Sequence, residues 1–292
     1  MICKFEELYQ QEASGQRARY EALREGFAQQ FGSAEGGQYF SAPGRSEIGG
    51  NHTDHNHGRV LALDPKEEGT SAALLRGICA RCVELGYQVG GFEAYTITRV
   101  LKGSGLSSSA AFEVLVVTIL NHLYNDDRMD PVTVAKIAQY AENVYFGKPS
   151  GLLDQMASSV GGFTSIDFND PENPIIEKVD FDISAQGYAL CVVDTGGNHA
   201  DLTNEYAAIP AEMKQVAGYF GKQFLRDVDE KEFYEQIGEI RKQTGDRAVL
   251  RAMHFFDDDR LAAEEAKALR AGDFAGFQEM VLASGRSSLQ RL

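Results

Sequence analysis

Residues 101–111 combine glycines and serines in the way that an anion-binding loop requires. Residues 92–98 alternate between apolar and polar as a strand does, and residues 110–124 are apolar at helical spacing, so this segment should join a strand to a helix. Gly103 and Gly105 allow close backbone approach, and the serines offer donors at the positive end of a helix dipole. The pattern indicates a phosphate cradle, although a well-capped turn would share it.

A second polar segment, residues 42–58, is dense in glycine, arginine, aspartate, asparagine and histidine. Buried polar groups need partners, so this segment is either a solvated turn or a binding site. Its candidate metal ligands are His52, Asp54, His55 and His57. Ligands so close in sequence do not easily converge on one ion, and no HExxH motif or distant cysteine and histidine partners accompany them. Recognition of a polyhydroxylated substrate, with charge from Arg45, is therefore the favoured hypothesis.

Composition narrows the classes of protein. A chain of 292 residues, 43% of them hydrophobic, can bury a large core in one large or two moderate domains. The formal charge of −15 disfavours a nucleic-acid or anionic-membrane surface. No apolar run reaches the length of a membrane span and the N-terminus resembles no signal peptide, so we expect a cytoplasmic protein. Cys79 and Cys82 have CxxC spacing but lack a second ligand pair.

The apolar pattern also predicts the elements that position these groups. Helices are expected at residues 16–31, 71–85, 110–124 and 131–145. Strands are expected at residues 38–42, 92–98, 163–168, 175–179 and 188–195. A further helix follows Tyr206, and Pro210 should lie close to its start because proline suits the first helical turn.

The segment Gly105-Leu106-Ser107-Ser108-Ser109-Ala110 resembles the ATP loop of the GHMP small-molecule kinases. The resemblance implies ATP as a substrate and a set of residues around its phosphates. These residues are Lys102, Gly103, Ser104, Gly105, Leu106, Ser107, Ser108, Ser109 and Ala110.

Within this superfamily, Pro43-Gly44-Arg45 followed by His52-Thr53-Asp54 is similar to the galactokinase signature, and the spacing matches without a gap as far as Gly58. The implied sugar-binding residues are Asn51, His52, Asp54, Gly151 and Tyr206. Asn51 stands where the signature has a glutamate, and an amide is neutral and can donate as well as accept. The identity of the sugar is therefore left open. Several strands that usually follow the signature are missing after Leu63.

Two carboxylates gain roles from the same resemblance. Asp154, which alone could be a helix cap, matches the aspartate that acts on the hydroxyl being phosphorylated, with Arg45 paired to it and stabilising the transferred phosphoryl group. Glu142, which alone would be read as a solvated helix residue, matches the family's magnesium ligand. Ser108 would be the other protein ligand of Mg²⁺, and phosphate oxygens and water would complete its shell.

The implied fold is α+β, the two-domain GHMP kinase fold. A ribosomal protein S5 domain 2-like domain would span residues 1–188, and an incomplete ferredoxin-like domain residues 189–292, which lack the family's second glycine-rich loop. The implied reaction moves the γ-phosphate of ATP to the 1-hydroxyl of galactose or a related sugar, in a monomer without nucleic-acid or membrane partners. The alternatives are a silent galactose and ATP sensor, a hydrolase built on the histidine cluster, and a GHMP kinase for another substrate.

Overall fold

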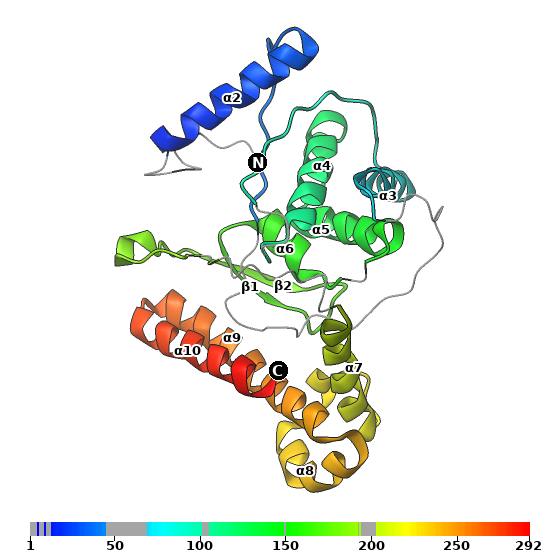
Figure 1. Ribbon diagram of the computed structural model, residues 1–292, viewed down its shortest axis with the longest axis vertical. Helices are drawn as coiled ribbons and strands as arrows, with labels where there is room; N and C mark the ends of the chain where they lie inside the picture. Colours follow the sequence, from blue (N-terminus) through cyan, green and yellow to red (C-terminus); the bar gives the residue numbers. More distant parts are fainter. Residues whose placement is uncertain are drawn as a thin grey trace.

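The computed structural model describes residues 5, 9, 13–44, 69–100, 105–148, 150–191, 193 and 203–292. Helices dominate this part of the chain (Figure 1). The helices are α2 (Ala13–Phe31), α3 (Ser71–Glu84), α4 (Ser108–Tyr124), α5 (Pro131–Tyr140), α6 (Leu153–Val160), α7 (Thr203–Tyr219), α8 (Glu230–Thr244), α9 (Asp246–Ala271) and α10 (Phe274–Arg291). The other elements are the π-helix η2 (Ala141–Phe146), the strands β1 (Phe163–Asp167) and β2 (Ile175–Val179), and the 3-10 turns η3 (Ser184–Gln186) and η5 (Leu225–Asp227).

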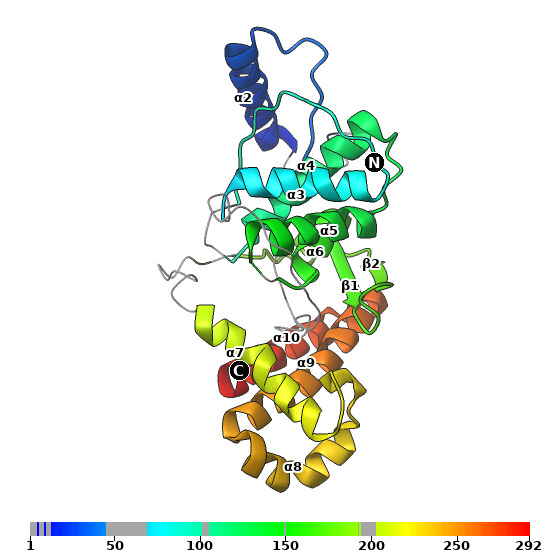
Figure 2. The ribbon, with the colours of Figure 1, turned by 90° about the vertical axis from the view of Figure 1, so that its right-hand side faces the viewer.

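Helix α4 runs through the core of the part that carries the candidate site. Its apolar residues pack against α3 and α5, where Ile78, Val117, Leu120 and Ile137 are buried together. Figure 2 shows α3 and α5 side by side. The sequence predicted these three helices and predicted that α4 would run through the core, and the structure confirms both predictions. Most residues on the buried face of α4 are apolar, which is why its pattern was easy to recognise.

Helices α7, α8 and α9 enclose a second core, which contains Val216, Phe233 and Ile240. A third cluster joins β2 to α9 and α10 through Val179, Leu269 and Phe277. The β1–β2 hairpin therefore lies between the two helical parts, as Figure 1 shows.

The two strands pair antiparallel, with Phe163 opposite Val179. Both were predicted. The strands predicted at residues 38–42 and 92–98, and the described part of 188–195, were wrong, because those residues form no strand in the structure. An alternating sequence gives a segment the side chains of a strand, but the backbone also needs a neighbouring strand as a hydrogen-bonding partner. Residues 92–98 are mostly exposed, and they pair with no strand in the described ranges.

Helix α7 begins at Thr203, so the prediction that it starts near Pro210 was also wrong. Proline removes one helical hydrogen bond, but Ile209 and Met213 beside it are buried in the second core. Packing on both sides of Pro210 holds the helix together across it. The mixed helical and strand content agrees with the α+β class.

Candidate active site

Glu142 lies on the π-helix that continues α5. Asp130 caps the start of α5 and Pro131 occupies its first turn, and the π-helix ends at Gly147, whose φ of 80° suits a residue without a side chain. π-Helical turns are rare and often occur at functional sites. The side chain of Glu142 is 1% exposed, so the solvated-face interpretation was wrong.

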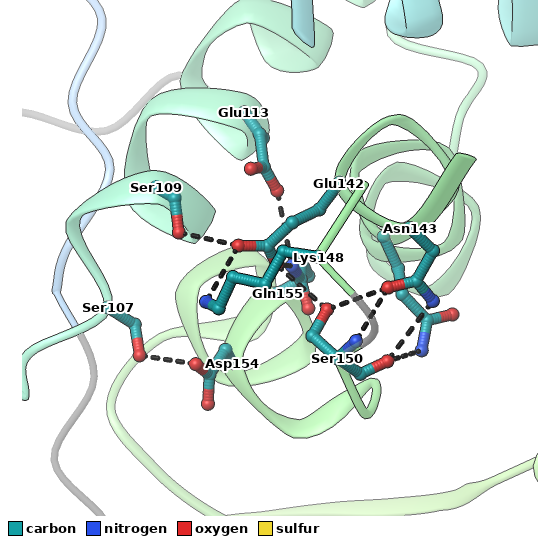
Figure 3. Close-up of polar contacts among 10 residues, drawn as sticks. Ser107, Ser109, Glu113, Glu142, Asn143, Lys148, Ser150, Asp154 and Gln155 are labelled. Carbon is teal, nitrogen blue, oxygen red and sulfur yellow. Dashed lines mark hydrogen bonds and ion pairs between the residues drawn. The ribbon is translucent and has the colours of Figure 1, made fainter. Parts of the chain in front are cut away.

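Both carboxylate oxygens of Glu142 accept hydrogen bonds (Figure 3). Oε1 accepts from Ser109 Oγ at 2.8 Å and from Lys148 Nζ at 3.0 Å. Oε2 accepts from Ser150 Oγ at 2.8 Å and from Gln155 Nε2 at 2.6 Å. These partners compensate the cost of burying a carboxylate.

Gln155 connects Glu142 to a second buried carboxyl group, that of Glu113 on α4. The Gln155 amide donates to Glu142 Oε2 and also to Glu113 Oε2 at 3.1 Å. Burial, reinforced by the charge of Glu142, raises the pKa of Glu113 to about 8. Glu113 therefore keeps its proton at neutral pH. Sequence reasoning missed it, although a lone glutamate in the apolar run of α4 was a signal.

Asp154 also contacts the predicted phosphate loop, residues 101–111, through Ser107 in its described part. Ser107 Oγ donates to Asp154 Oδ2 at 2.5 Å, which joins the first turn of α6 to the residue that precedes α4. Ser107 has a left-handed backbone with φ of 53°, and Gly105 has φ of 75°. A serine in that region is strained, and such strain is concentrated at functional sites.

Lys148 is a cation among these carboxylates. Burial by itself lowers the pKa of Lys148, but the charge and hydrogen bond of Glu142 more than offset it, so the pKa lies above its ordinary value. Asn143 and Ser150 hold the turn around it, because Asn143 Oδ1 accepts from the Ser150 backbone N–H at 2.7 Å and its amide donates back to the Ser150 carbonyl at 3.1 Å. Sequence reasoning missed Lys148, since a lysine in a polar turn gives no signal of its own.

The described part of the predicted ATP loop runs from Gly105 to Ala110. Ala110 is fully buried beneath the loop, and the residues from 106 to 109 are half-buried. Gly151 lies in the half-buried turn before α6. The other predicted site residues lie outside the described residues, or their side chains do. They are Arg45, Asn51, His52, Asp54, Lys102, Gly103, Ser104 and Tyr206.

The arrangement around Glu142 suits Mg²⁺. Ser109 Oγ and Glu142 Oε1 are hard oxygen atoms of the kind that bind Mg²⁺. In this structure the ammonium of Lys148 lies 3.0 Å from the same carboxylate oxygen and balances its charge. The sequence assigned the hydroxyl to Ser108, whereas the hydroxyl described in contact with Glu142 is that of Ser109. Among the described side chains, no three of the His, Cys, Asp and Glu type form a metal cluster.

Comparison with known protein families shows to which class of protein this chain is similar. Residues 73–162 match the GHMP kinases N terminal domain, and residues 25–63 match the galactokinase galactose-binding signature. The first match contains the described loop, Glu142 and Asp154. Fold and site together define a GHMP small-molecule kinase, a class that uses ATP.

Relatives narrow this to one family. The chain is 30% identical over 294 residues to the galactokinase of Glaesserella parasuis, covering 85% of this chain and 72% of the relative. It is 29% identical over 308 residues to human galactokinase, covering 90% and 76%. The crystal structure of Lactococcus lactis galactokinase complexed with galactose has the same fold, with a TM-score of 0.71, 24% identity and coverage of 94% and 80%. The chain belongs to the galactokinase family, which confirms the predicted family and fold class.

No helix in the described ranges is both long and apolar enough to cross a bilayer.

Proposed function

We propose that this protein transfers the γ-phosphoryl group of ATP to the 1-hydroxyl of galactose or a closely related sugar. One observation carries the proposal: Ser107 contacts Asp154 and Ser109 contacts Glu142, so two neighbouring serines at the start of α4 meet both candidate carboxylates. A member of the galactokinase family needs a phosphate cradle beside a proton acceptor and a metal ligand. The silent sensor would not need Asp154 at that place.

Asp154 is the proposed proton acceptor. Its carboxylate lies at the start of α6, where Oδ2 accepts a hydrogen bond from the Ser107 hydroxyl, and this bond helps to orient the group that would accept the proton of the sugar hydroxyl. The N-terminus of α4 supplies backbone N–H groups and a favourable dipole to the phosphates. Arg45 is proposed to pair with Asp154 and to balance charge on the transferred phosphoryl group.

Glu142, with Ser108 or Ser109, is proposed to hold Mg²⁺. The bound ion would neutralise phosphate charge during transfer. Ser150 and Gln155 both donate hydrogen bonds to Glu142 Oε2, and these bonds keep the carboxylate in one orientation.

The sugar contacts from Asn51, His52, Asp54, Gly151 and Tyr206 stay predictions. The same holds for the ATP contacts from Lys102, Gly103 and Ser104, the domain boundary after residue 188, the cytoplasmic location and the monomeric state. Asn51 makes the choice of sugar the first question to test, since an amide can accept from or donate to a hydroxyl.

The test is ATP-dependent phosphorylation of galactose, N-acetylgalactosamine, glucose and mevalonate by the wild type and by Asp154→Asn. We expect turnover of galactose or a close relative, and a loss of about 10²- to 10⁴-fold in Asp154→Asn with sugar affinity within a few fold. Asp180→Asn, which neutralises an exposed aspartate, is the control and should keep full activity. Sugar binding without turnover of any substrate would favour the sensor instead.

A further inference from the structure

Lys148 and Glu142 form an unequal ion pair. The carboxylate side chain is 1% exposed, whereas the lysine side chain is 57% exposed. Lys148 binds Oε1, the oxygen that Ser109 of the phosphate loop also contacts, while Oε2 faces Ser150 and Gln155. The lysine therefore covers the one carboxylate oxygen that faces the loop.

The ammonium of Lys148 lies where the charges of the site converge. In Figure 3 it lies between the Ser109–Glu142 pair and the Ser107–Asp154 pair. Its interactions with the carboxylates of Glu142 and Asp154 both favour the charged form. A divalent cation bound to Glu142 Oε1 would need this same region, and two cations cannot share it without strong repulsion.

We infer that Lys148 is a resident counter-ion of Glu142, which a divalent cation must displace before it can bind Oε1. The inference rests on the proposed function, because that function makes Glu142 the metal ligand. Displacement is feasible because lysine is a flexible side chain and Lys148 is half in solvent, so its ammonium can move into water. When no metal is bound, Lys148 keeps the buried carboxylate of Glu142 paired. When a metal ion binds, this ion pair must break, and the free energy that this costs lowers the apparent affinity of the site for the metal ion.

The test is the affinity of the full chain for Mn²⁺ alone, measured by electron paramagnetic resonance of free Mn²⁺ at pH 7.5. Lys148→Met removes the counter-ion and should tighten Mn²⁺ binding about tenfold, which is about 1.4 kcal/mol. Lys148→Arg keeps the charge and should stay within about threefold of the wild type. Lys136→Met is the matched control, since it removes the same charge from an exposed pair with Glu172, and it should change the affinity less than twofold.

Glu142→Gln separates the inference from the function on which it rests. If Glu142→Gln loses Mn²⁺ binding while Lys148→Met binds Mn²⁺ no more tightly than the wild type, the counter-ion role is overturned and the metal ligand stands. If Glu142→Gln binds Mn²⁺ as the wild type does, the proposed ligand falls and the inference falls with it. A Lys148→Met protein with no detectable bound Mn²⁺, its fold verified by circular dichroism, also overturns the inference.

Discussion

Glu113 should make the protein less stable as the pH rises. Its side chain is fully buried, and burial together with the charge of Glu142 raises its pKa from 4.5 to about 8. Between these values the unfolded chain has lost the proton while the native state keeps it. Because the native state then binds more protons, the free energy of unfolding falls as the pH rises from about 4.5 to about 8 and is level above that.

The size of this change in the free energy of unfolding follows from the difference between the two pKa values of Glu113. Each pH unit corresponds to about 1.4 kcal/mol, which gives an upper limit of about 5 kcal/mol. Relaxation around the ionised group reduces this, so we expect about 2 to 3 kcal/mol. Glu113→Gln has nearly the same shape as the protonated acid and exchanges no proton, so it should remove this pH dependence.

The assay is urea unfolding followed by circular dichroism at pH 5, 6, 7 and 8. The difference in stability between Glu113→Gln and the wild type should move in favour of the variant by about 2 to 3 kcal/mol over this range. Glu279→Gln, at an exposed position of α10, is the control and should follow the wild type at every pH. If the difference between Glu113→Gln and the wild type stayed constant with pH, the raised pKa of Glu113 would be refuted.

Two further predictions concern the elements that hold the site. Gly77→Ala would place a Cβ 2.9 Å from the Cα of Ala141 in η2, so we expect a loss of about 1 to 3 kcal/mol in urea unfolding. Gly238→Ala meets open space in α8 and should stabilise by about 0.5 to 1 kcal/mol, and an equal loss in both variants would contradict the packing argument. Ser107→Ala removes the donor to Asp154 and should lower kcat about tenfold with stability within 1 kcal/mol of the wild type, whereas an unchanged kcat would show that this hydrogen bond does not position Asp154.

Local sequence predicted much of the fold. The helices α3, α4 and α5 were found because apolar periodicity is a property of consecutive residues. The starts of α3 and α5 also carry capping side chains, those of Thr70 and Asp130. The hairpin strands β1 and β2 were found because each has a partner close by in the chain. The segment at residues 92–98 has the same kind of pattern but no such neighbour, and a pattern cannot provide a partner.

Some features of the candidate site could likewise be predicted from the sequence, and others could not. The sequence by itself determined the glycine and serine loop and picked out Asp154 and Glu142, because their neighbours in the chain resemble family motifs. Only the tertiary structure decided that Glu142 is buried, that Gln155 joins it to the buried Glu113, and that Lys148 pairs with its Oε1 atom. Burial, pKa and ion pairing depend on groups that folding brings together from distant positions, and a linear motif carries no record of those distances.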